Sequence, residues 1–315
     1  MDQQEVSAGS PFVPSAPWDG SARVAELDGP VHWVDFGDPG TGRPPIVLVH
    51  GLGGSHLNWV SVAPALAKHT HVVAIDLPGF GLTPTAGRSA AVRPNTELLA
   101  RFVDEVVEGP AIVVGNSMGG MISLLLADAH PDSVAALVLV NPSVPQRALT
   151  LDREVALAVG TTALPMVGAR VARRLRTAAP AREGVQRVLD LCFADPGRTD
   201  PRVVDAAVEL AEYRLRQPAE DRAFSAAARS LIGVARRRAR YYALMRRVRV
   251  PVLLVHGSQD RLVSRAAADK VARANPGWEY LLLDGVGHTP QMEVPDRFAD
   301  EVLGWLARTG VLPKG

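Results

Sequence analysis

Short runs of apolar residues alternate with longer segments of helical periodicity over most of the chain. The runs are rich in Val, Leu and Ile: PIVLVHG (45–51), HVVAIDLPG (71–79), AIVVGNS (111–117), VAALVLVNP (134–142), VPVLLVHG (250–257) and WEYLLLDG (278–285). Runs of this kind are typical of strands that are buried on both faces. An antiparallel hairpin is expected before them, from RVAELDG and VHWVDFGD.

The segments between these runs have the pattern of helices that pack by one face. In NTELLARFVDEVVEG (95–109), six apolar residues form a single stripe and the charges lie opposite. The same pattern is found in HLNWVSVAPALAKH (56–69), GGMISLLLADAH (119–130), SRAAADKVARA (264–274) and VPDRFADEVLGWLA (294–307). Alternating strands and helices predict an α/β fold, with a parallel sheet covered by helices on both faces.

One long segment breaks the alternation. From Ser143 to Arg249 the chain shows no strand pattern, only helix-forming residues interrupted by prolines. A helical insertion at this point is expected to cover the carboxyl ends of the strands, where open parallel sheets bind ligands. We therefore predict a core domain of residues 21–142 and 250–315, a helical cap domain of residues 143–249, and an N-terminal arm, residues 1–20, without regular structure.

A serine flanked by glycines lies where a buried strand should end. In VVGNSMGG, Gly115, Ser117 and Gly119 form the motif G-x-S-x-G at a predicted strand-to-helix junction. So sharp a turn strains the serine backbone and leaves no room for a Cβ on the neighbouring residues. The following helix directs N–H groups and its positive dipole end toward the serine. Ser117 is therefore predicted to be an exposed nucleophile.

A serine hydroxyl needs a histidine base and an acid that orients this base. Asp260 follows a predicted strand in HGSQDRLVS, and His288 lies in the glycine-rich loop of DGVGHTPQMEVPDRF. The order Ser117, Asp260, His288 is the one expected for a nucleophile on such a turn. Asp284 is an alternative acid, but it lies only four residues before His288, so we favour Asp260.

The oxyanion formed during attack needs two backbone donors. We predict that they are the N–H groups of Met118, next to the nucleophile, and of Leu52, in the glycine-rich loop after VLVHG. Trp59 and Met292 are candidates either for lining a substrate pocket or for simple packing.

Three other polar residues at strand ends are interpreted as structural. His50 and His256 each precede a glycine, and no third residue has a spacing suited to a metal ion. Asp76 begins DLPGFG, and its carboxylate is expected to accept loop N–H bonds beside Gly79 and Gly81. No metal site is predicted.

Composition narrows the classes of function. Of the 315 residues, 47% are apolar and 21% are charged, as in a folded globular protein. The net charge of +1 gives no basis for nucleic-acid binding by the whole molecule. Cys192, the single cysteine, excludes an internal disulfide. No apolar run reaches the ~18 residues that span a bilayer, and the first residues do not resemble a signal peptide, so a cytoplasmic location is expected.

Charge is distributed unevenly along the chain. Residues 143–249 contain 21 Arg, no Lys and 11 acidic residues. Such a segment suits contact with an anionic membrane, attraction of carboxylate substrates, or a solvated outer face of cap helices, and we favour the solvated face. The inner face is expected to be aliphatic and to hold an acyl chain, with Leu164 and Met166 as substrate-binding residues. The apolar residues expected on this face are Leu157, Val159, Leu164, Met166, Val167 and Leu189.

Five motifs in this order resemble the α/β-hydrolase superfamily: HGLGGS (50–55), DLPGFG (76–81), GNSMGG (115–120), HGSQD (256–260) and GHTPQME (287–293). The resemblance implies an eight-stranded, mostly parallel sheet, a helical cap inserted after the sixth strand, and no metal or organic cofactor. It also implies Ser117, Asp260 and His288 as a catalytic triad and Leu52 and Met118 as the oxyanion hole.

The strand-to-helix turn that carries the nucleophile is called the elbow in this superfamily. A serine at this position indicates acyl-enzyme chemistry, whereas epoxide hydrolases and haloalkane dehalogenases have an Asp there. We expect a cofactor-independent serine esterase that acts on small-molecule esters with an apolar acyl group. GNSMGG also resembles the elbow of the carbon–carbon bond hydrolases of ring-fission products. However, GLGGSHLNW and HTPQME differ from the Gly-Pro-Gly segment and the aromatic-rich run of those enzymes. A cofactor-free perhydrolase and a non-catalytic ligand-binding module are further alternatives.

Overall fold

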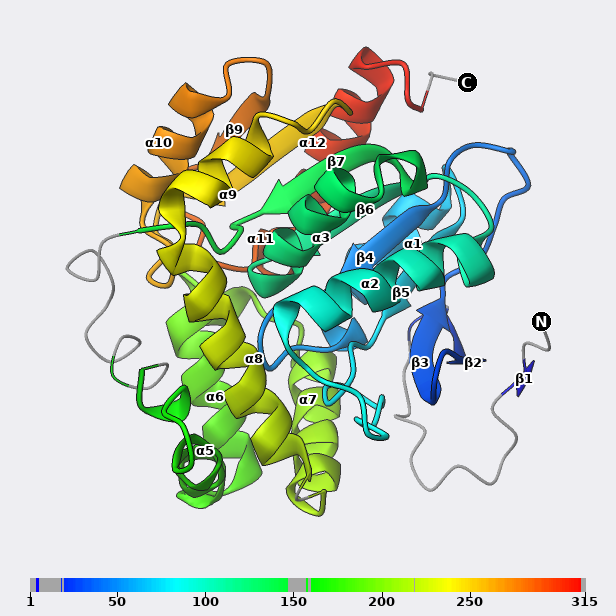
Figure 1. The fold of residues 1–315 in the computed structure, drawn as a ribbon. Coiled ribbons are helices and arrows are strands. Elements are labelled where there is room, and N and C mark those ends of the chain that lie inside the picture. Colours follow the sequence, from blue (N-terminus) through cyan, green and yellow to red (C-terminus); the bar gives the residue numbers. More distant parts are fainter. Residues whose placement is uncertain are drawn as a thin grey trace.

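One mixed sheet runs through the molecule (Figure 1). The computed structural model describes residues 4–5, 18, 20–146, 157, 160–217 and 219–312. The strands are β1 (Gln4–Glu5), β2 (Ser21–Glu26), β3 (Pro30–Asp35), β4 (Ile46–Val49), β5 (Val72–Ile75), β6 (Ala111–Asn116), β7 (Val134–Val140), β8 (Val252–Gly257) and β9 (Glu279–Leu283). The eight expected strands are present. The ninth, β1, is a two-residue strand of the N-terminal arm, where no element was expected; it pairs with β2.

The strand order is β1-β2-β3-β5-β4-β6-β7-β8-β9. From β5 to β9 every neighbouring pair is parallel, whereas β1, β2 and β3 are antiparallel and join the sheet through β5. The predicted hairpin and the predicted mostly parallel sheet are therefore confirmed. A parallel sheet brings the ends of β4, β6, β7 and β8 to one edge, and the loops that follow them meet there.

Helices cover both faces of this sheet. Outside the segment between β7 and β8 they are η1 (His56–Asn58), α1 (Ala63–Ala67), α2 (Val92–Phe102), the π-helical turn η2 (Val103–Val107), α3 (Met118–Ala129), η3 (Pro131–Ser133), α10 (Arg265–Ala274), α11 (Pro290–Glu293) and α12 (Pro295–Arg308). Successive residues of β4 face opposite sides, as the two-residue period of a strand requires. Val47 and Val49 pack with α2 and α3, and Ile46 and Leu48 pack with α1 and α12.

Further helices lie between β7 and β8. They are α5 (Gly168–Thr177), α6 (Ala181–Cys192), η5 (Pro196–Arg198), α7 (Pro201–Leu215), α8 (Ala219–Arg236) and α9 (Arg238–Met245). Figure 1 shows α5 to α8 gathered at one end of the sheet. Ala223 and Phe224 of α8 lie against Gly79 and Gly53, in the loops that follow β5 and β4. These contacts place α8 against two of the loops at the edge where the parallel strands end. No helix of the described residues is long and apolar enough to cross a membrane.

The prediction of an aliphatic inner face for this helical segment is wrong for most of the residues named. Met166 is 95% exposed and Leu164 is 47% exposed, so neither lines a buried pocket. Leu157 and Val167 are also exposed, Leu189 is buried, and Val159 lies outside the described residues. The reason is that Leu164, Met166 and Val167 lie in a turn before α5 and not in a helix with an inner face.

Candidate functional site

Ser117 lies at the sharp turn between β6 and α3. Its φ of 55° and ψ of −114° form a strained conformation that residues other than glycine rarely adopt. Two main-chain hydrogen bonds hold the turn: the Ser117 N–H donates to the Val140 carbonyl at 3.0 Å, and the Ser143 N–H donates to the Ser117 carbonyl at 2.9 Å. Strain at a polar side chain, stabilised by its surroundings, is typical of functional sites.

The glycines around this serine are required by close packing. A Cβ on Gly115 would lie 2.5 Å from the Gly119 carbonyl oxygen. A Cβ on Gly119 would collide with the carbonyl oxygens of Val49 and His50, at the end of β4. The predicted reason for glycine at both positions is therefore confirmed. The absence of these side chains lets α3 begin directly against the loop after β4.

The loop after β4 lies beside the serine. A Cβ on Gly51 would be 3.0 Å from the Ser117 Cβ, so the main chain leading to Leu52 passes next to the nucleophile position. Within the described part of the chain, neither the Leu52 N–H nor the Met118 N–H donates a hydrogen bond to a protein group. Both donors predicted for an oxyanion therefore lack an acceptor among the described protein groups.

Asp260 and His288 form a buried pair. The His288 Nδ1 lies 2.8 Å from the Asp260 Oδ2, and both side chains are almost completely inaccessible to solvent. The Asp260 Oδ1 accepts the N–H groups of Leu262 at 2.7 Å and Val263 at 3.0 Å. Burial raises the pKa of the Asp260 carboxyl, but the charge and hydrogen bond of His288 lower it more, so this pKa lies below its ordinary value. Asp260 therefore stays ionised beside the imidazole.

Asp284, the alternative acid, lies elsewhere. Its side chain is exposed and accepts a hydrogen bond from the Ser258 hydroxyl at 3.0 Å. The structure therefore pairs His288 with Asp260 and not with Asp284.

The Ser117 hydroxyl is not hydrogen-bonded to His288 within the described residues; its Oγ lies 3.4 Å from the Ser143 Oγ. The two segments are nevertheless adjacent, because the Asn116 amide donates to the His288 carbonyl oxygen at 3.0 Å. Asn116 precedes the nucleophile directly, so the histidine loop is attached to the turn that carries the serine.

Asn141 is a site residue that we did not predict from the sequence. It follows β7, is completely buried, and donates from its amide to the Asp260 Oδ2 at 2.7 Å. Its φ of 44° is a left-handed conformation that asparagine tolerates better than most residues. An asparagine directly after a buried strand, before Pro142, was the available sequence signal.

Glu293 is a second residue that the sequence analysis missed. Its buried carboxylate accepts the N–H of Gly287 at 2.7 Å, next to His288. It also accepts the N–H groups of Ala194 at 3.2 Å and Asp195 at 3.1 Å, and Arg198 lies 3.2 Å away as its counter-charge. The His288 N–H in turn donates to the Cys192 carbonyl at 2.5 Å. The histidine loop is thereby attached to the segment that follows α6.

Trp59 and Met292, the two candidates for lining a pocket or for packing, belong to one hydrophobic cluster. Trp59 is fully buried in the core on the α1 and α12 side of the sheet, and Met292 packs against the same core. The Asn58 amide lies 3.2 Å from the Met292 sulfur. Packing is therefore observed for both.

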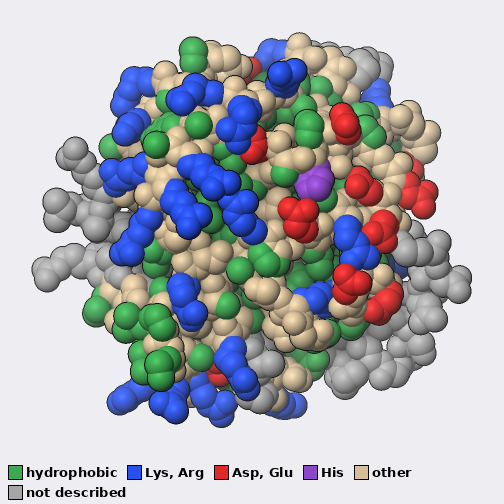
Figure 2. All heavy atoms as spheres, in the orientation of Figure 1, with side chains coloured by type: hydrophobic (Ala, Val, Ile, Leu, Met, Phe, Trp, Pro, Cys, Tyr) green, Lys and Arg blue, Asp and Glu red, His purple; other side chains and the backbone are tan. Residues whose placement is uncertain are grey.

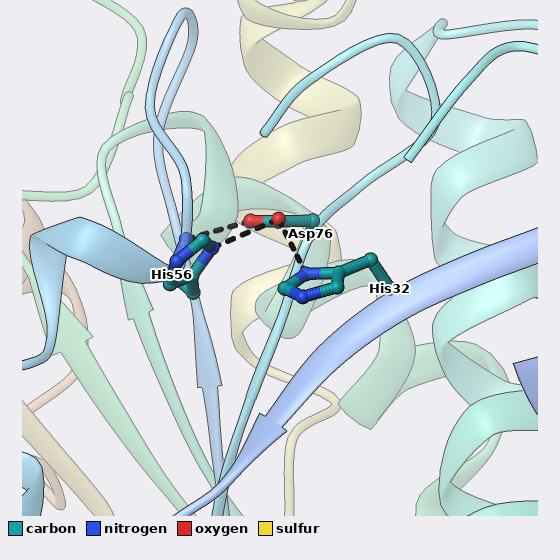
Figure 3. A group of neighbouring side chains, drawn as sticks. All are labelled: His32, His56 and Asp76. Carbon is teal, nitrogen blue, oxygen red and sulfur yellow. Dashed lines mark hydrogen bonds and ion pairs between the residues drawn. The ribbon is translucent and has the colours of Figure 1, made fainter. Parts of the chain in front are cut away.

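His32, His56 and Asp76 form a second buried cluster (Figure 3). The Asp76 Oδ2 lies 2.8 Å from the His32 Nδ1 and 2.9 Å from the His56 Nδ1. The carboxylate also accepts the main-chain N–H of His56 at 2.6 Å and of Leu82 at 2.9 Å. The predicted acceptance of loop N–H bonds by Asp76 is confirmed.

The ligand atoms of this cluster lie within 4.8 Å of one another, so it is the group of described residues that could hold a metal ion. Burial raises the pKa of Asp76, but His56 and His32 lower it more, to well below its ordinary value. A carboxylate oxygen that already accepts three hydrogen bonds is a poor ligand for a further cation. We therefore interpret the cluster as a network that anchors η1 and the preceding loop to β3 and β5.

The chain matches the sequence model of the alpha/beta hydrolase fold family over residues 44–295. It is similar to the dihydrolipoyllysine-residue acetyltransferase component of the acetoin cleaving system of Pseudomonas putida, with 28% identity over 90% of this chain and 69% of the relative. It is 24% identical to the human monoacylglycerol lipase ABHD6, over 88% of this chain and 81% of the lipase. A thermophilic esterase of Thermogutta terrifontis has a similar fold, with a TM-score of 0.69, 23% identity and coverage of 92% and 95% of the two chains.

Two further relatives are named for activities other than ester cleavage. A 2-hydroxy-6-oxo-6-(2'-aminophenyl)hexa-2,4-dienoic acid hydrolase of Metapseudomonas resinovorans is 27% identical over 86% of each chain. The magnesium-chelatase 30 kDa subunit of Rhodobacter capsulatus is 28% identical over 97% of this chain and 99% of its own. With the fold, the serine elbow and the match over most of its length, the chain belongs to the α/β-hydrolase fold family.

Proposed function

We propose that the protein is a serine hydrolase that cleaves a carboxylic ester through an acyl-enzyme intermediate. One observation carries the proposal: the strained Ser117 turn lies beside the hydrogen-bonded Asp260–His288 pair, with Asn116 joining the two segments. A nucleophile, a base and an orienting acid are the groups that acyl transfer requires.

Each group has a defined step. The Ser117 hydroxyl turns from Ser143 toward His288 and attacks the ester carbonyl, and its proton passes to the His288 Nε2. Asp260 holds the Nδ1 proton and stabilises the imidazolium that forms. The N–H groups of Leu52 and Met118 bind the oxyanion. The alcohol leaves with the proton from His288, and a water molecule deprotonated by His288 then releases the acid and restores the serine.

Residues 143–249 act as a cap in this proposal, over a core of residues 21–142 and 250–315. Support comes from α8, whose Ala223 and Phe224 lie on the loops after β5 and β4, and from the contact of the segment after α6 with the His288 loop. A small ester with an apolar acyl group enters between the cap and the sheet. The name of the monoacylglycerol lipase relative is consistent with an acyl ester as substrate.

Turnover of p-nitrophenyl esters from acetate to laurate tests this function. The wild type is expected to exceed the Ser117→Ala variant by at least about a thousandfold in kcat/KM on the preferred ester. A fluorophosphonate should label the Ser117 peptide of the wild type, as detected by mass spectrometry, and leave the variant unlabelled. Equal rates for the two proteins on every ester, with no labelling, would refute the proposal.

Cleavage of a carbon–carbon bond in a 2-hydroxy-6-oxo-dienoate is the second candidate, favoured by the similarity to the dienoic acid hydrolase. The same three residues can serve this reaction, so only activity on defined substrates distinguishes it from ester hydrolysis. A kcat/KM for such a dienoate above that for every ester would assign the second function.

A further inference from the structure

Among the residues that the structure describes, the large hydrophobic side chains that are exposed all lie between positions 157 and 188. They are Leu157, Leu164, Met166, Val167, Leu175 and Val188. Leu164, Met166 and Val167 belong to the turn before α5, Leu175 to α5 and Val188 to α6, while Leu157 precedes this turn in the sequence. The surfaces of soluble proteins contain scattered apolar residues, whereas a concentration of exposed apolar side chains marks an interaction site.

Arginines accompany these apolar residues. The exposed ones between residues 160 and 188 are Arg170, Arg173, Arg174, Arg182 and Arg187, whereas Glu183 is the acidic residue of that stretch. Arg170, Arg174 and Arg187 have no ion-pair partner among the described residues. Figure 2 shows hydrophobic side chains at the lower left, over α5, with Lys and Arg side chains along the lower edge beside them.

The helix that presents these residues is fixed to its neighbour. Gly168 and Ala172 form the buried side of α5. Arg176 pairs with the buried Asp221 of α8 at 2.7 Å. Arg170 and Arg174, four residues apart, therefore lie on the outer side of α5. Figure 1 places α5 at the end of the helical segment that lies away from the sheet, so this face is not covered by the core.

We propose that this face, formed by the exposed residues of 157–188 and called here the docking face, binds the surface of an anionic phospholipid bilayer. Guanidinium groups form paired hydrogen bonds with phosphate oxygens, and aliphatic side chains enter the boundary between headgroups and acyl chains. The inference goes beyond the proposed ester hydrolysis, since it concerns where the protein binds and not which bond it cleaves.

The residue types favour a bilayer over a protein partner. Centres of protein interfaces are enriched in Tyr, Trp, Phe, Met and Arg, so the feature that sets this face apart is that the exposed large apolar side chains described on it include no aromatic residue. The six exposed apolar side chains are aliphatic or Met, which suits fluid acyl chains. The surplus of arginine over acidic residues complements a negatively charged membrane surface.

Co-sedimentation of the full chain with vesicles tests the proposal. Binding is expected for equimolar phosphatidylcholine and phosphatidylglycerol at low salt, at least tenfold weaker binding for phosphatidylcholine alone, and weakening with added salt. Arg170→Glu/Arg174→Glu should bind the anionic vesicles at least tenfold more weakly than the wild type, and Leu175→Ser/Val188→Ser several-fold more weakly. The matched control is Arg93→Glu/Arg297→Glu, which makes the same charge change at exposed positions of α2 and α12.

Several results would overturn the inference. One is that the wild type binds neutral and anionic vesicles equally well, and another is that it binds neither kind. A third is that Arg93→Glu/Arg297→Glu loses as much vesicle affinity as Arg170→Glu/Arg174→Glu, because the net charge alone would then account for binding. Self-association that Leu175→Ser/Val188→Ser abolishes, without vesicle binding, would assign the face to a second copy of the chain. Each variant should keep the wild-type rate on a soluble p-nitrophenyl ester, so loss of docking is distinguishable from loss of catalysis.

Discussion

At the scale of single residues, His50 shows how the loop that carries Leu52 is held. The His50 Nε2 accepts the Leu77 N–H at 3.0 Å, so this nitrogen carries no proton. The Nδ1 therefore carries the proton of the neutral ring and donates it to the Gly51 carbonyl at 2.7 Å. Complete burial lowers the pKa of His50 to about 4. A protonated His50 would lose the bond to Leu77 and place a charge in the core.

This pKa predicts loss of stability in mild acid. The unfolded chain binds a proton at His50 near pH 6.5, and the folded chain binds it near pH 4, so the unfolded state holds more protons between these values. The contribution of neutral His50 to the free energy of unfolding is complete above pH 6.5. It decreases as the pH falls toward 4, by about 3 kcal/mol in total. Urea unfolding of the wild type and of His50→Gln between pH 7 and 4 measures it.

The variant should show the smaller decrease in the free energy of unfolding over this range. Burial also lowers the pKa of His32 and His256, but their contributions are shared by both proteins and cancel in the comparison. Parallel curves for the two proteins would contradict the prediction.

At the scale of elements, glycines have opposite roles in different helices. In α3, Gly119 lets the helix begin against the main chain of Val49 and His50. In α8, a Cβ at Gly233 would meet no atom within 4 Å apart from its own neighbouring helix backbone. The same substitution by alanine should therefore change stability in opposite directions.

We expect Gly119→Ala to destabilise the protein by at least about 2 kcal/mol, because the new methyl group collides with main-chain oxygens that cannot move independently of β4. Gly233→Ala should stabilise it by about 0.5–1 kcal/mol, since alanine is the better helix former. Midpoints of denaturant unfolding test both variants. Destabilisation by Gly233→Ala or tolerance of Gly119→Ala would show that the packing around the helix is different.

At the scale of the whole molecule, Glu293 joins the sheet to the helices inserted between β7 and β8. Its carboxylate binds Gly287 on one side and Ala194, Asp195 and Arg198 on the other, while itself being fully buried. Removing one member of a buried charged network leaves the other groups without partners, which is more costly than losing an exposed pair.

Glu293→Gln should therefore lower the free energy of unfolding by about 3 kcal/mol. It should also lower kcat on the preferred ester, because the His288 loop loses an anchor, and speed proteolysis near residues 194–198. Glu279→Gln is the matched control: Glu279 forms an exposed pair with Arg308 and should contribute at most about 1 kcal/mol. Equal effects of the two substitutions would rule out this role of Glu293.

The sequence by itself determined the alternation of strands and helices, the elbow and the order of its predicted partners. Burial on both faces of a strand requires an uninterrupted apolar run, and the packing at Gly115 and Gly119 forbids a side chain. Both requirements act within one element or one turn, so the residue types at those positions record them directly.

Only the tertiary structure decided which distant residues meet. Asn141 reaches Asp260 across 119 positions of sequence, and no local pattern distinguishes it from any polar residue after a strand. The apolar residues of the turn before α5 have the composition of a core, yet Leu164, Met166 and Val167 are exposed. An apolar side chain shows that burial is favourable, but the surface that buries it is supplied by the packing of other segments.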